Sequence, residues 1–235
     1  TDFDNRRDVD LLMVPYGARP KLFRNRRTGE FVDAADTAGL PDAGAYTSLA
    51  LGDVNKDGFT DLFLGREGAP GLWAMSDGQE RFRVTEGPPR SANTTAAQLV
   101  DYDNDGLIDL VTLTTGGPRL FRNLGARFED YTDRAFPADL DSQGSLVALA
   151  AGDLDLDGDS DLVVLASSGA LRVWRNDGGN RHPSVRVRLA GLVSNRGGVG
   201  AKIEMRAGSL HQKAETASAT PAVAPADIVF GLGGR

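Results

Sequence analysis

Short apolar runs alternate with polar turns along this chain, a pattern that predicts β-strands rather than long helices. The runs before a polar turn are 49–52, 97–100 and 146–150, and those after it are 62–64, 110–113 and 162–165. They are short, partly β-branched and bounded by Gly, as buried strands are. No long amphipathic helical pattern occurs, and 29 of the 235 residues are Gly. The pattern predicts an all-β chain.

The polar turns between these runs share one pattern, D-x-[DN]-x-D-G-x-x-D-L, at 53–62, 101–110 and 153–162. We call them loops 2, 3 and 4. Oxygen-bearing side chains fall at positions 1, 3, 5 and 9, and Gly at position 6 allows the sharp turn that a calcium loop requires. The predicted side-chain ligands are Asp53, Asn55, Asp57 and Asp61 in loop 2, Asp101, Asp103, Asp105 and Asp109 in loop 3, and Asp153, Asp155, Asp157 and Asp161 in loop 4. Position 7 offers a backbone carbonyl, from Phe59, Leu107 and Asp159.

These loops differ from EF-hands. An EF-hand ends on a bidentate Glu at position 12 and lies between helices. Position 12 here is Leu64, Thr112 or Val164, and predicted strands flank each loop. A solvent-exposed Asp- and Gly-rich turn is the alternative interpretation, but such a turn does not require four aligned oxygen positions in three copies. The sequence therefore predicts about three structural calcium ions, each of which ties two strands of one unit together.

The loops recur with a period near 50 residues. A degenerate copy, loop 1, occupies residues 2–11, and the four copies start at residues 2, 53, 101 and 153. A second motif keeps the same phase, as Leu-Phe-Arg-Asn at 22–25 and 120–123 and as Val-Trp-Arg-Asn at 173–176. Aromatic residues follow it at Phe31, Phe82 and Phe128. The period is typical of β-propellers, so we expect four-stranded blades with these aromatic residues packed between neighbouring blades.

Loop 1 departs from the pattern, because Arg6 and Arg7 stand where Asp and Gly are expected. We expect this loop to hold no calcium, since a cationic side chain would oppose the ion. Two arrangements of Arg6 remain open. Its guanidinium either pairs with an Asp of the same loop (Asp2, Asp4 or Asp10) or points to solvent.

Residues from about 184 onward predict a separate small β domain. Residues 185–189 and 201–205 alternate apolar and polar side chains, as half-buried strands do, and 228–230 supply a further short strand. The Ala- and Pro-rich stretch 217–226 is expected to be a loop.

The repeated loop with its flanking strands resembles the FG-GAP/VCBS repeats of integrin-α-like β-propellers. Residues 194–203 are similar to the S-N-R-x-x-[IV]-G-A-x-[IV] signature of the ASPIC/UnbV domain, and 230–233 to its F-G-L-G element. Together they resemble the CRTAC1-like group of extracellular and bacterial envelope proteins. The resemblance implies propeller repeats over 1–180 and an ASPIC/UnbV-like β domain over 184–235, and a calcium-bearing propeller used for adhesion or assembly.

Family propellers usually have more blades than the four units found here, and the chain begins inside a repeat. We therefore expect an incomplete or open ring and a truncated C-terminal domain. Unpaired strands at the ends of an open array invite pairing with a partner. We expect either a subunit of a larger assembly or a fragment of a longer propeller.

Charge and chemistry restrict the functions further. The net charge of −7 argues against general nucleic-acid binding, and no apolar run approaches the length of a membrane span. There is no Cys, and neither His182 nor His211 lies in a catalytic pattern. We expect a non-catalytic, calcium-stabilised module that binds a protein partner or acts as a scaffold outside the cell or in the periplasm. Association with a membrane complex and carbohydrate binding stay open. The alternative is a lyase or hydrolase that acts on polysaccharide from a propeller face.

Overall fold

The computed structural model describes residues 1–235 except 138–144, 194, 217–221, 224–226 and 235. Its described residues form short strands in several small sheets, with two one-turn α-helices, α1 (Ala35–Ala38) and α2 (Thr132–Ala135), and two 3₁₀ turns at Pro89–Ser91 and Gly179–Arg181. None of the helices in the described part of the chain has the length and apolar character needed to cross a membrane. The all-β prediction is confirmed.

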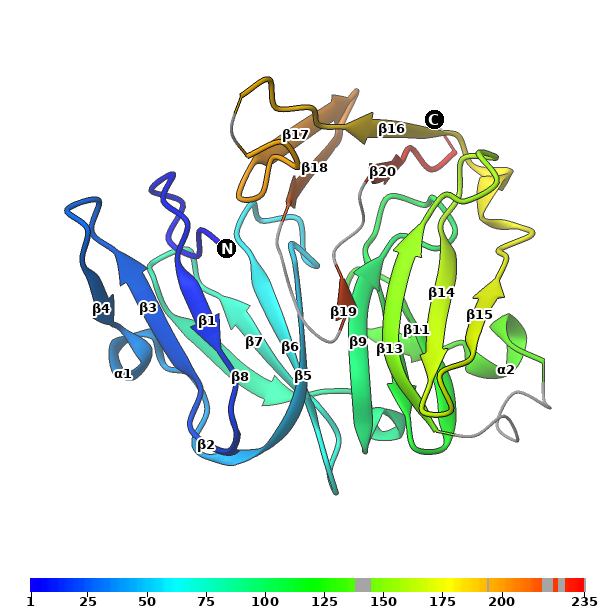
Figure 1. Cartoon of the computed structure of the whole chain (residues 1–235). Helices are drawn as coiled ribbons and strands as arrows, with labels where there is room; N and C mark the ends of the chain where they lie inside the picture. The colour runs from blue at the N-terminus through cyan, green and yellow to red at the C-terminus, as the bar shows by residue number, and fades with distance from the viewer. Residues whose placement is uncertain (138–144, 194, 217–221, 224–226, 235) are drawn as a thin grey trace.

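Four sheets stand side by side as successive blades (Figure 1). Blade 1 contains β1 (Leu11–Met13), β3 (Lys21–Asn25) and β4 (Phe31–Asp33). Blade 2 contains β5 (Gly44–Gly52), β6 (Asp61–Arg66), β7 (Leu72–Ser76) and β8 (Phe82–Glu86), and β2 (Tyr16–Ala18) pairs with β5. Blade 3 contains β9 (Thr94–Val100), β10 (Asp109–Thr114), β11 (Gly117–Asn123) and β12 (Phe128–Asp130). Blade 4 contains β13 (Leu146–Gly152), β14 (Asp161–Ala166) and β15 (Leu171–Trp174).

The prediction of four strands per blade holds for the second and third repeats but not for the other two. In the first, the described residues before loop 1 supply no strand, and β2 pairs with the neighbouring blade instead. In the fourth, β19 (Ala222–Val223) adds to β13 in parallel, so that strand comes from the C-terminal part of the chain. The stretch 217–226 is thus not wholly a loop, and its other residues lie outside the described part. No strand pairing among the described residues joins blade 1 to blade 4.

The hydrophobic core consists of layers between successive blades. Leu22, Leu62 and Leu64 are buried between blades 1 and 2. Phe63, Leu110 and Phe121 fill the layer between blades 2 and 3, and Leu113, Leu149 and Val164 the layer between blades 3 and 4. Blades 2 and 3, which have a blade on each side, therefore bury both faces of their central strands, and this explains why these strands read as continuous apolar runs.

The repeated aromatic residues of blades 2 and 3 pack against the neighbouring blade. Trp73 of blade 2 stacks on Phe128 of blade 3 with ring centroids 4.7 Å apart, and Phe82 lies 6.3 Å from Phe3. Phe31 is the exception to the expectation, since it is 46% exposed. It lies on β4, the outer strand of blade 1, at an end of the array, and no further blade among the described residues packs against this strand.

The C-terminal strands lie across the loop ends of the blades (Figure 1). They form two ribbons, in which β16 (Ser184–Arg188) pairs with β20 (Asp227–Gly231) and β17 (Lys202–Ala207) with β18 (Leu210–Glu215). The three strands expected from the sequence are present, and the described residues of 184–206 contain no helix. This placement brings the C-terminal part of the chain next to the Asp-rich loops.

Candidate metal centres

All four Asp-rich loops adopt the same backbone turn. Position 4 is left-handed in each, with φ of 57° at Asn5, 62° at Lys56, 54° at Asn104 and 67° at Leu156. Position 6 also has positive φ, at 84° for Gly58, 90° for Gly106 and 98° for Gly158. A side chain is disfavoured at such angles, which is why Gly recurs there. The turn connects the first and second strands of a blade in loops 2, 3 and 4.

The Asp at position 9 fastens each loop to the blade behind it. In loop 3 the carboxylate of Asp109 accepts the backbone N–H of Tyr102 at 3.1 Å and that of Asn123 at 2.7 Å. The equivalent Asp61 and Asp161 accept the corresponding pair of N–H groups in loops 2 and 4, and Asp10 does so in loop 1. Asp61 and Asp109 are fully buried. Position 9 is therefore a structural anchor as well as a potential ligand.

The carboxylates at positions 1, 3 and 9 converge. Asp101, Asp103 and Asp109 bring one oxygen each to within 4.8 Å of one another, and so do Asp153, Asp155 and Asp161. Loop 2 presents the carboxamide of Asn55 at position 3 in place of a third carboxylate. Asp53 is buried there, and its two oxygens accept the N–H groups of Asp57 and Gly58.

Position 5 makes contacts of its own in the structure, and its role as a direct ligand stays a prediction. Asp105 ion-pairs with Arg122 at 3.0 Å, and Asp157 accepts from the Asn180 amide at 2.7 Å. Asp57 accepts the Phe59 N–H at 2.8 Å, and Asp105 and Asp157 accept the N–H of position 7 likewise. By these hydrogen bonds the position-5 carboxylates stabilise the turn. The position-7 residues, Phe59, Leu107 and Asp159, belong to the same turn as the converging carboxylates.

Several buried oxygens in these loops have no hydrogen-bond donor. Among the described residues they include one oxygen each of Asp101, Asp103, Asp153 and Asp159. A buried carboxylate oxygen without a partner is costly unless a cation satisfies it. Oxygen donors in this number and spacing suit Ca²⁺. The residues present in loops 3 and 4 therefore fit the ion that the sequence predicts.

The electrostatics point the same way. Burial raises the pKa of Asp61 to about 7, and burial together with the charge of Asp105 raises the pKa of Asp101 to about 7. Burial and the neighbouring Asp157 raise the pKa of Asp159 to about 7, and burial holds the pKa of Asp109 well above its ordinary value. The loops thus gather negative charge that is unfavourable without a counter-ion.

The second repeated motif supplies contacts that the sequence did not reveal. Its Arg reaches the position-3 Asp of the same repeat: Arg122 lies 2.6 Å from Asp103, and Arg175 lies 3.9 Å from Asp155. Its Asn links blades, because the Asn123 amide donates to the carbonyl of Val54 in loop 2 at 2.8 Å. Asn176 donates to the carbonyl of Tyr102 in loop 3 at 2.6 Å. The sequence signal for these contacts was the recurrence of Arg-Asn at a nearly constant offset from loops 1, 3 and 4.

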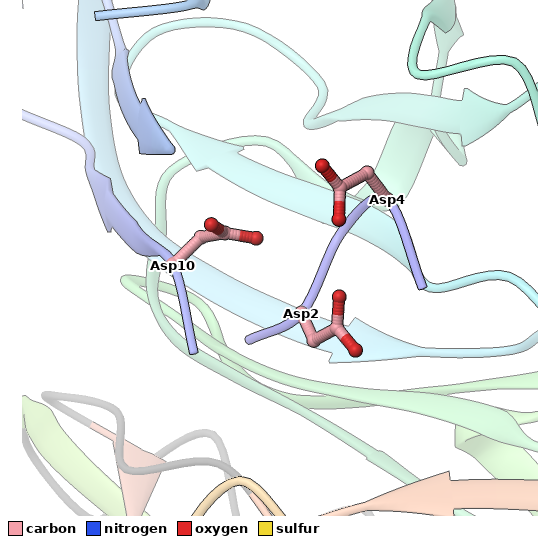
Figure 2. A group of neighbouring side chains, drawn as sticks. All are labelled: Asp2, Asp4 and Asp10. Carbon is pink, nitrogen blue, oxygen red and sulfur yellow. The ribbon is translucent and has the colours of Figure 1, made fainter. Parts of the chain in front are cut away.

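Loop 1 also brings its three Asp side chains together. The carboxylates of Asp2, Asp4 and Asp10 face a common space in Figure 2, with one oxygen of each within 4.8 Å of the others. Arg6 lies 3.5 Å from Asp4, which is the first of the two arrangements left open by the sequence. The guanidinium also pairs with Glu80 of the neighbouring blade.

Comparisons with known proteins place this arrangement in a family. The FG-GAP-like repeat family matches three overlapping segments, residues 2–64, 53–112 and 101–164. Human cartilage acidic protein 1 is 30% identical over 182 residues, which cover 71% of this chain and 28% of the human protein. The Xenopus tropicalis protein of that name is 31% identical over 157 residues, 61% of this chain and 24% of the frog protein. The chain therefore spans about a quarter of the length of these relatives.

A solved structure shares the fold. It is that of an Agrocybe aegerita lectin described as recognising non-reducing terminal N-acetylglucosamine, with a TM-score of 0.51 and 18% identity over 78% of this chain and 58% of that one. The family match covers the four loops and most of the blades described above. This chain belongs to the FG-GAP-like repeat family, whose repeats are propeller blades.

Proposed function

We propose that this chain is a non-catalytic, calcium-stabilised propeller segment that binds a protein partner or acts as a scaffold in an extracellular or envelope assembly. The observation that carries the proposal is the convergence of three carboxylates in each of loops 3 and 4, with buried oxygens that lack any donor. Bound calcium would supply the missing positive charge at these oxygens. Three such ions would bring the net charge from −7 to about −1.

The strand edges support a partner-binding role. β15 pairs only with β14 among the described residues, and its Leu171 and Val173 are 71% and 60% exposed. At the other end of the array, β1 pairs only with β3 and exposes Leu11 and Met13. An apolar edge strand with unpaired backbone groups is suited to pairing with another chain.

The pockets give little support to an enzyme. A cavity of about 370 Å³ between blades 2 and 3 is lined by Trp73, Phe128 and neighbouring residues, and Glu86 is the one carboxylate among its lining residues. Glycoside hydrolysis ordinarily requires a pair of carboxylates. The names of the relatives, cartilage acidic protein 1, also carry no catalytic meaning.

Titration calorimetry on chelator-treated protein tests the calcium component. We expect about three ions per chain, with dissociation constants of about 10⁻⁴–10⁻³ M if the module works outside the cell. The double variant Asp103→Ala with Asp155→Ala should retain about one ion, in loop 2, where the position-3 ligand Asn55 is untouched. The control variant Asp133→Ala with Asp177→Ala removes two carboxylates that are 86% and 71% exposed outside the loops, and should bind as the parent does. Equal binding by both variants would contradict the assignment.

Light scattering after size-exclusion chromatography, with and without calcium, tests the assembly component. A calcium-dependent complex with a candidate partner supports the proposal, and a glycan array separates a carbohydrate ligand from a protein one. Release of new reducing ends from a polysaccharide, abolished by Glu86→Gln, would instead identify the enzyme.

A further inference from the structure

Loop 1 keeps the turn of a metal loop although two of its key residues are cationic. Asn5 and Arg7 have φ of 57° and 67°, so positions 4 and 6 are left-handed as in the other loops. A non-Gly residue at such an angle is strained, and the surrounding contacts must hold it there. The Asp2 carboxylate does so by accepting the N–H of Arg6 at 3.0 Å and that of Arg7 at 2.8 Å.

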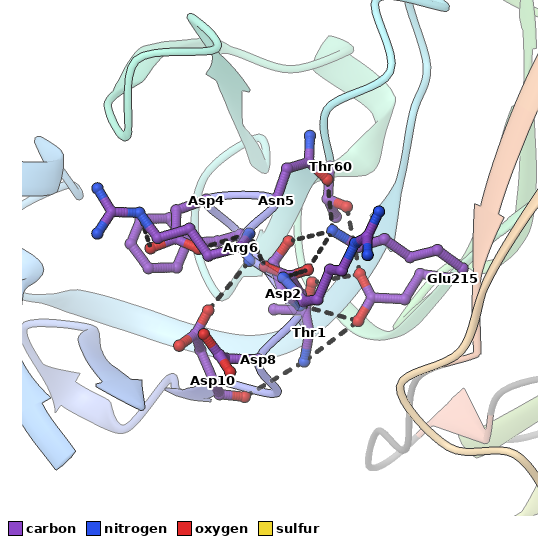
Figure 3. A network of polar contacts seen from close by, with 12 residues as sticks. Thr1, Asp2, Asp4, Asn5, Arg6, Asp8, Asp10, Thr60 and Glu215 are labelled. Atoms are coloured by element: carbon purple, nitrogen blue, oxygen red, sulfur yellow. Dashed lines mark hydrogen bonds and ion pairs between the residues drawn. The ribbon is translucent and has the colours of Figure 1, made fainter. Parts of the chain in front are cut away.

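A side chain from the C-terminal ribbon reaches into this loop. The Nζ of Lys202 on β17 lies 2.6 Å from a carboxylate oxygen of Asp2 and donates to the Asp2 backbone carbonyl at 3.0 Å. It also donates to the side-chain oxygen of Asn5. The side chains of Asp2 and Lys202 are 2% and 18% exposed. Three oxygens of one loop thus surround the ammonium group of Lys202, and the Asn5 oxygen also accepts from Lys213 at 2.6 Å. Figure 3 shows the network around Asp2 and Asn5.

A second carboxylate of loop 1, that of Asp4, also pairs with a cationic side chain. Asp4 is 2% exposed at its side chain and lies 3.2 Å from the Nε of Arg24. Arg24 belongs to the repeated Leu-Phe-Arg-Asn motif, and its contact with position 3 matches that of Arg122 in loop 3. Loop 4 has a weaker counterpart of Lys202: Arg186 of β16 lies 3.3 Å from the position-1 residue Asp153, but its side chain is 37% exposed, and one oxygen of Asp153 is left without a hydrogen-bond donor.

The electrostatics of position 1 distinguish this loop from loops 2 and 3. Burial raises the pKa of Asp53 and of Asp101. Burial acts on Asp2 too, but the hydrogen bond and charge of Lys202 bring its pKa below the ordinary value. Asp2 is thus a carboxylate whose counter-ion is already in place.

We propose that loop 1 is a cation site whose resident cation is the ε-ammonium group of Lys202. The ammonium group takes the role that calcium would take in loops 2, 3 and 4. This lets loop 1 keep its turn without metal and fastens the C-terminal strands to the first blade. A divalent ion and the ammonium group cannot share the site, since both would lie within a few ångströms of Asp2. The inference stands whether or not the chain binds a partner.

Restoring the metal motif tests the proposal. Arg6→Asp with Arg7→Gly returns loop 1 to D-x-D-x-D-G-x-x-D-L. With Lys202→Met added, we expect calorimetry to find one more calcium ion than in the parent chain. With Lys202 retained, that additional ion should be absent or bind at least tenfold more weakly. Equal binding with and without Lys202 would overturn the proposal, and so would failure of the triple variant to bind an additional ion.

A single variant tests the fastening directly by hydrogen exchange. In Lys202→Met the amides of Arg6 and Arg7 should lose protection, in chelator and in calcium alike. The matched control is Arg206→Met, which removes a 74% exposed positive charge from the same strand. Retained protection in Lys202→Met, or equal loss in the control, would show that the ammonium group does not hold the loop.

Discussion

Positions 3 and 9 of loop 3 should respond differently to the same truncation. Asp109→Ala leaves the buried N–H groups of Tyr102 and Asn123 without their acceptor. Each unsatisfied buried donor costs about 1–3 kcal/mol, so the variant should lose about 2–6 kcal/mol of unfolding free energy even in chelator. Asp103→Ala breaks one ion pair with Arg122, which keeps Asp105 as a partner. Its cost in chelator should be below about 1 kcal/mol.

Calcium should reveal a loss in Asp103→Ala that is absent in chelator. At a calcium concentration one hundred times the dissociation constant, a single bound ion adds about 2.7 kcal/mol to the stability of the parent chain. Asp103→Ala should lose most of that contribution, because a converging ligand is gone. Asp109→Asn is the conservative variant, since its carboxamide oxygen can still accept one of the two N–H groups. We therefore expect its loss in chelator to be about half that of Asp109→Ala.

Urea unfolding followed by circular dichroism, in chelator and at saturating calcium, measures both terms. In a chain of this size a loss of 1 kcal/mol lowers the melting temperature by about 2–4 °C, so thermal melts provide a second readout. Equal destabilisation of Asp103→Ala and Asp109→Ala in chelator would refute the distinction between ligand and anchor. So would a full calcium-induced increase in stability for Asp103→Ala.

Three further predictions follow from the loops and the blades. In chelator, the melting temperature should fall as the pH rises from about 4 to about 7. Burial raises the pKa of Asp61, Asp101 and Asp159 to about 7, so the stability that their protonated forms contribute is complete below the unfolded pKa near 4 and is lost as the pH rises through 7. Calcium should remove the fall, and a rise in chelator would contradict the prediction. Gly231→Ala should weaken calcium binding at loop 3 and lower the melting temperature, because a Cβ there would lie 2.2 Å from a carboxylate oxygen of Asp101, whereas Gly234→Ala, with open space around it, should do neither. Trp73→Ala should cost about 3–5 kcal/mol in urea unfolding, with or without calcium, because it empties the contact with Phe63 and Phe128 between blades 2 and 3.

The blades and the converging carboxylates could be predicted because both are local features. Positions 1 to 9 of each loop are close in sequence. Strand pairing begins directly beside them, as when Gly52 pairs with Asp61 at the two ends of loop 2. The partners from elsewhere could not be predicted in this way. Lys202 and Asp2 are 200 residues apart, and β19 pairs with β13 across more than seventy residues. Alternating patterns identify a strand but not the surface on which it lies, so the docking of the C-terminal ribbons needed the structure.

The turn at position 6 explains why the C-terminal strands and the loops belong together. In each of loops 2, 3 and 4 the carbonyl of the motif Gly accepts a hydrogen bond from the C-terminal part of the chain. Gly58 accepts from Lys213, Gly106 from Gln212 at 2.7 Å, and Gly158 from Ser184. The same turn thus gathers the converging carboxylates and binds the C-terminal strands. A bound ion that rigidifies the turn would also fix these acceptor carbonyls. Calcium in three loops and the ammonium group of Lys202 in the fourth would then hold the same C-terminal strands in place.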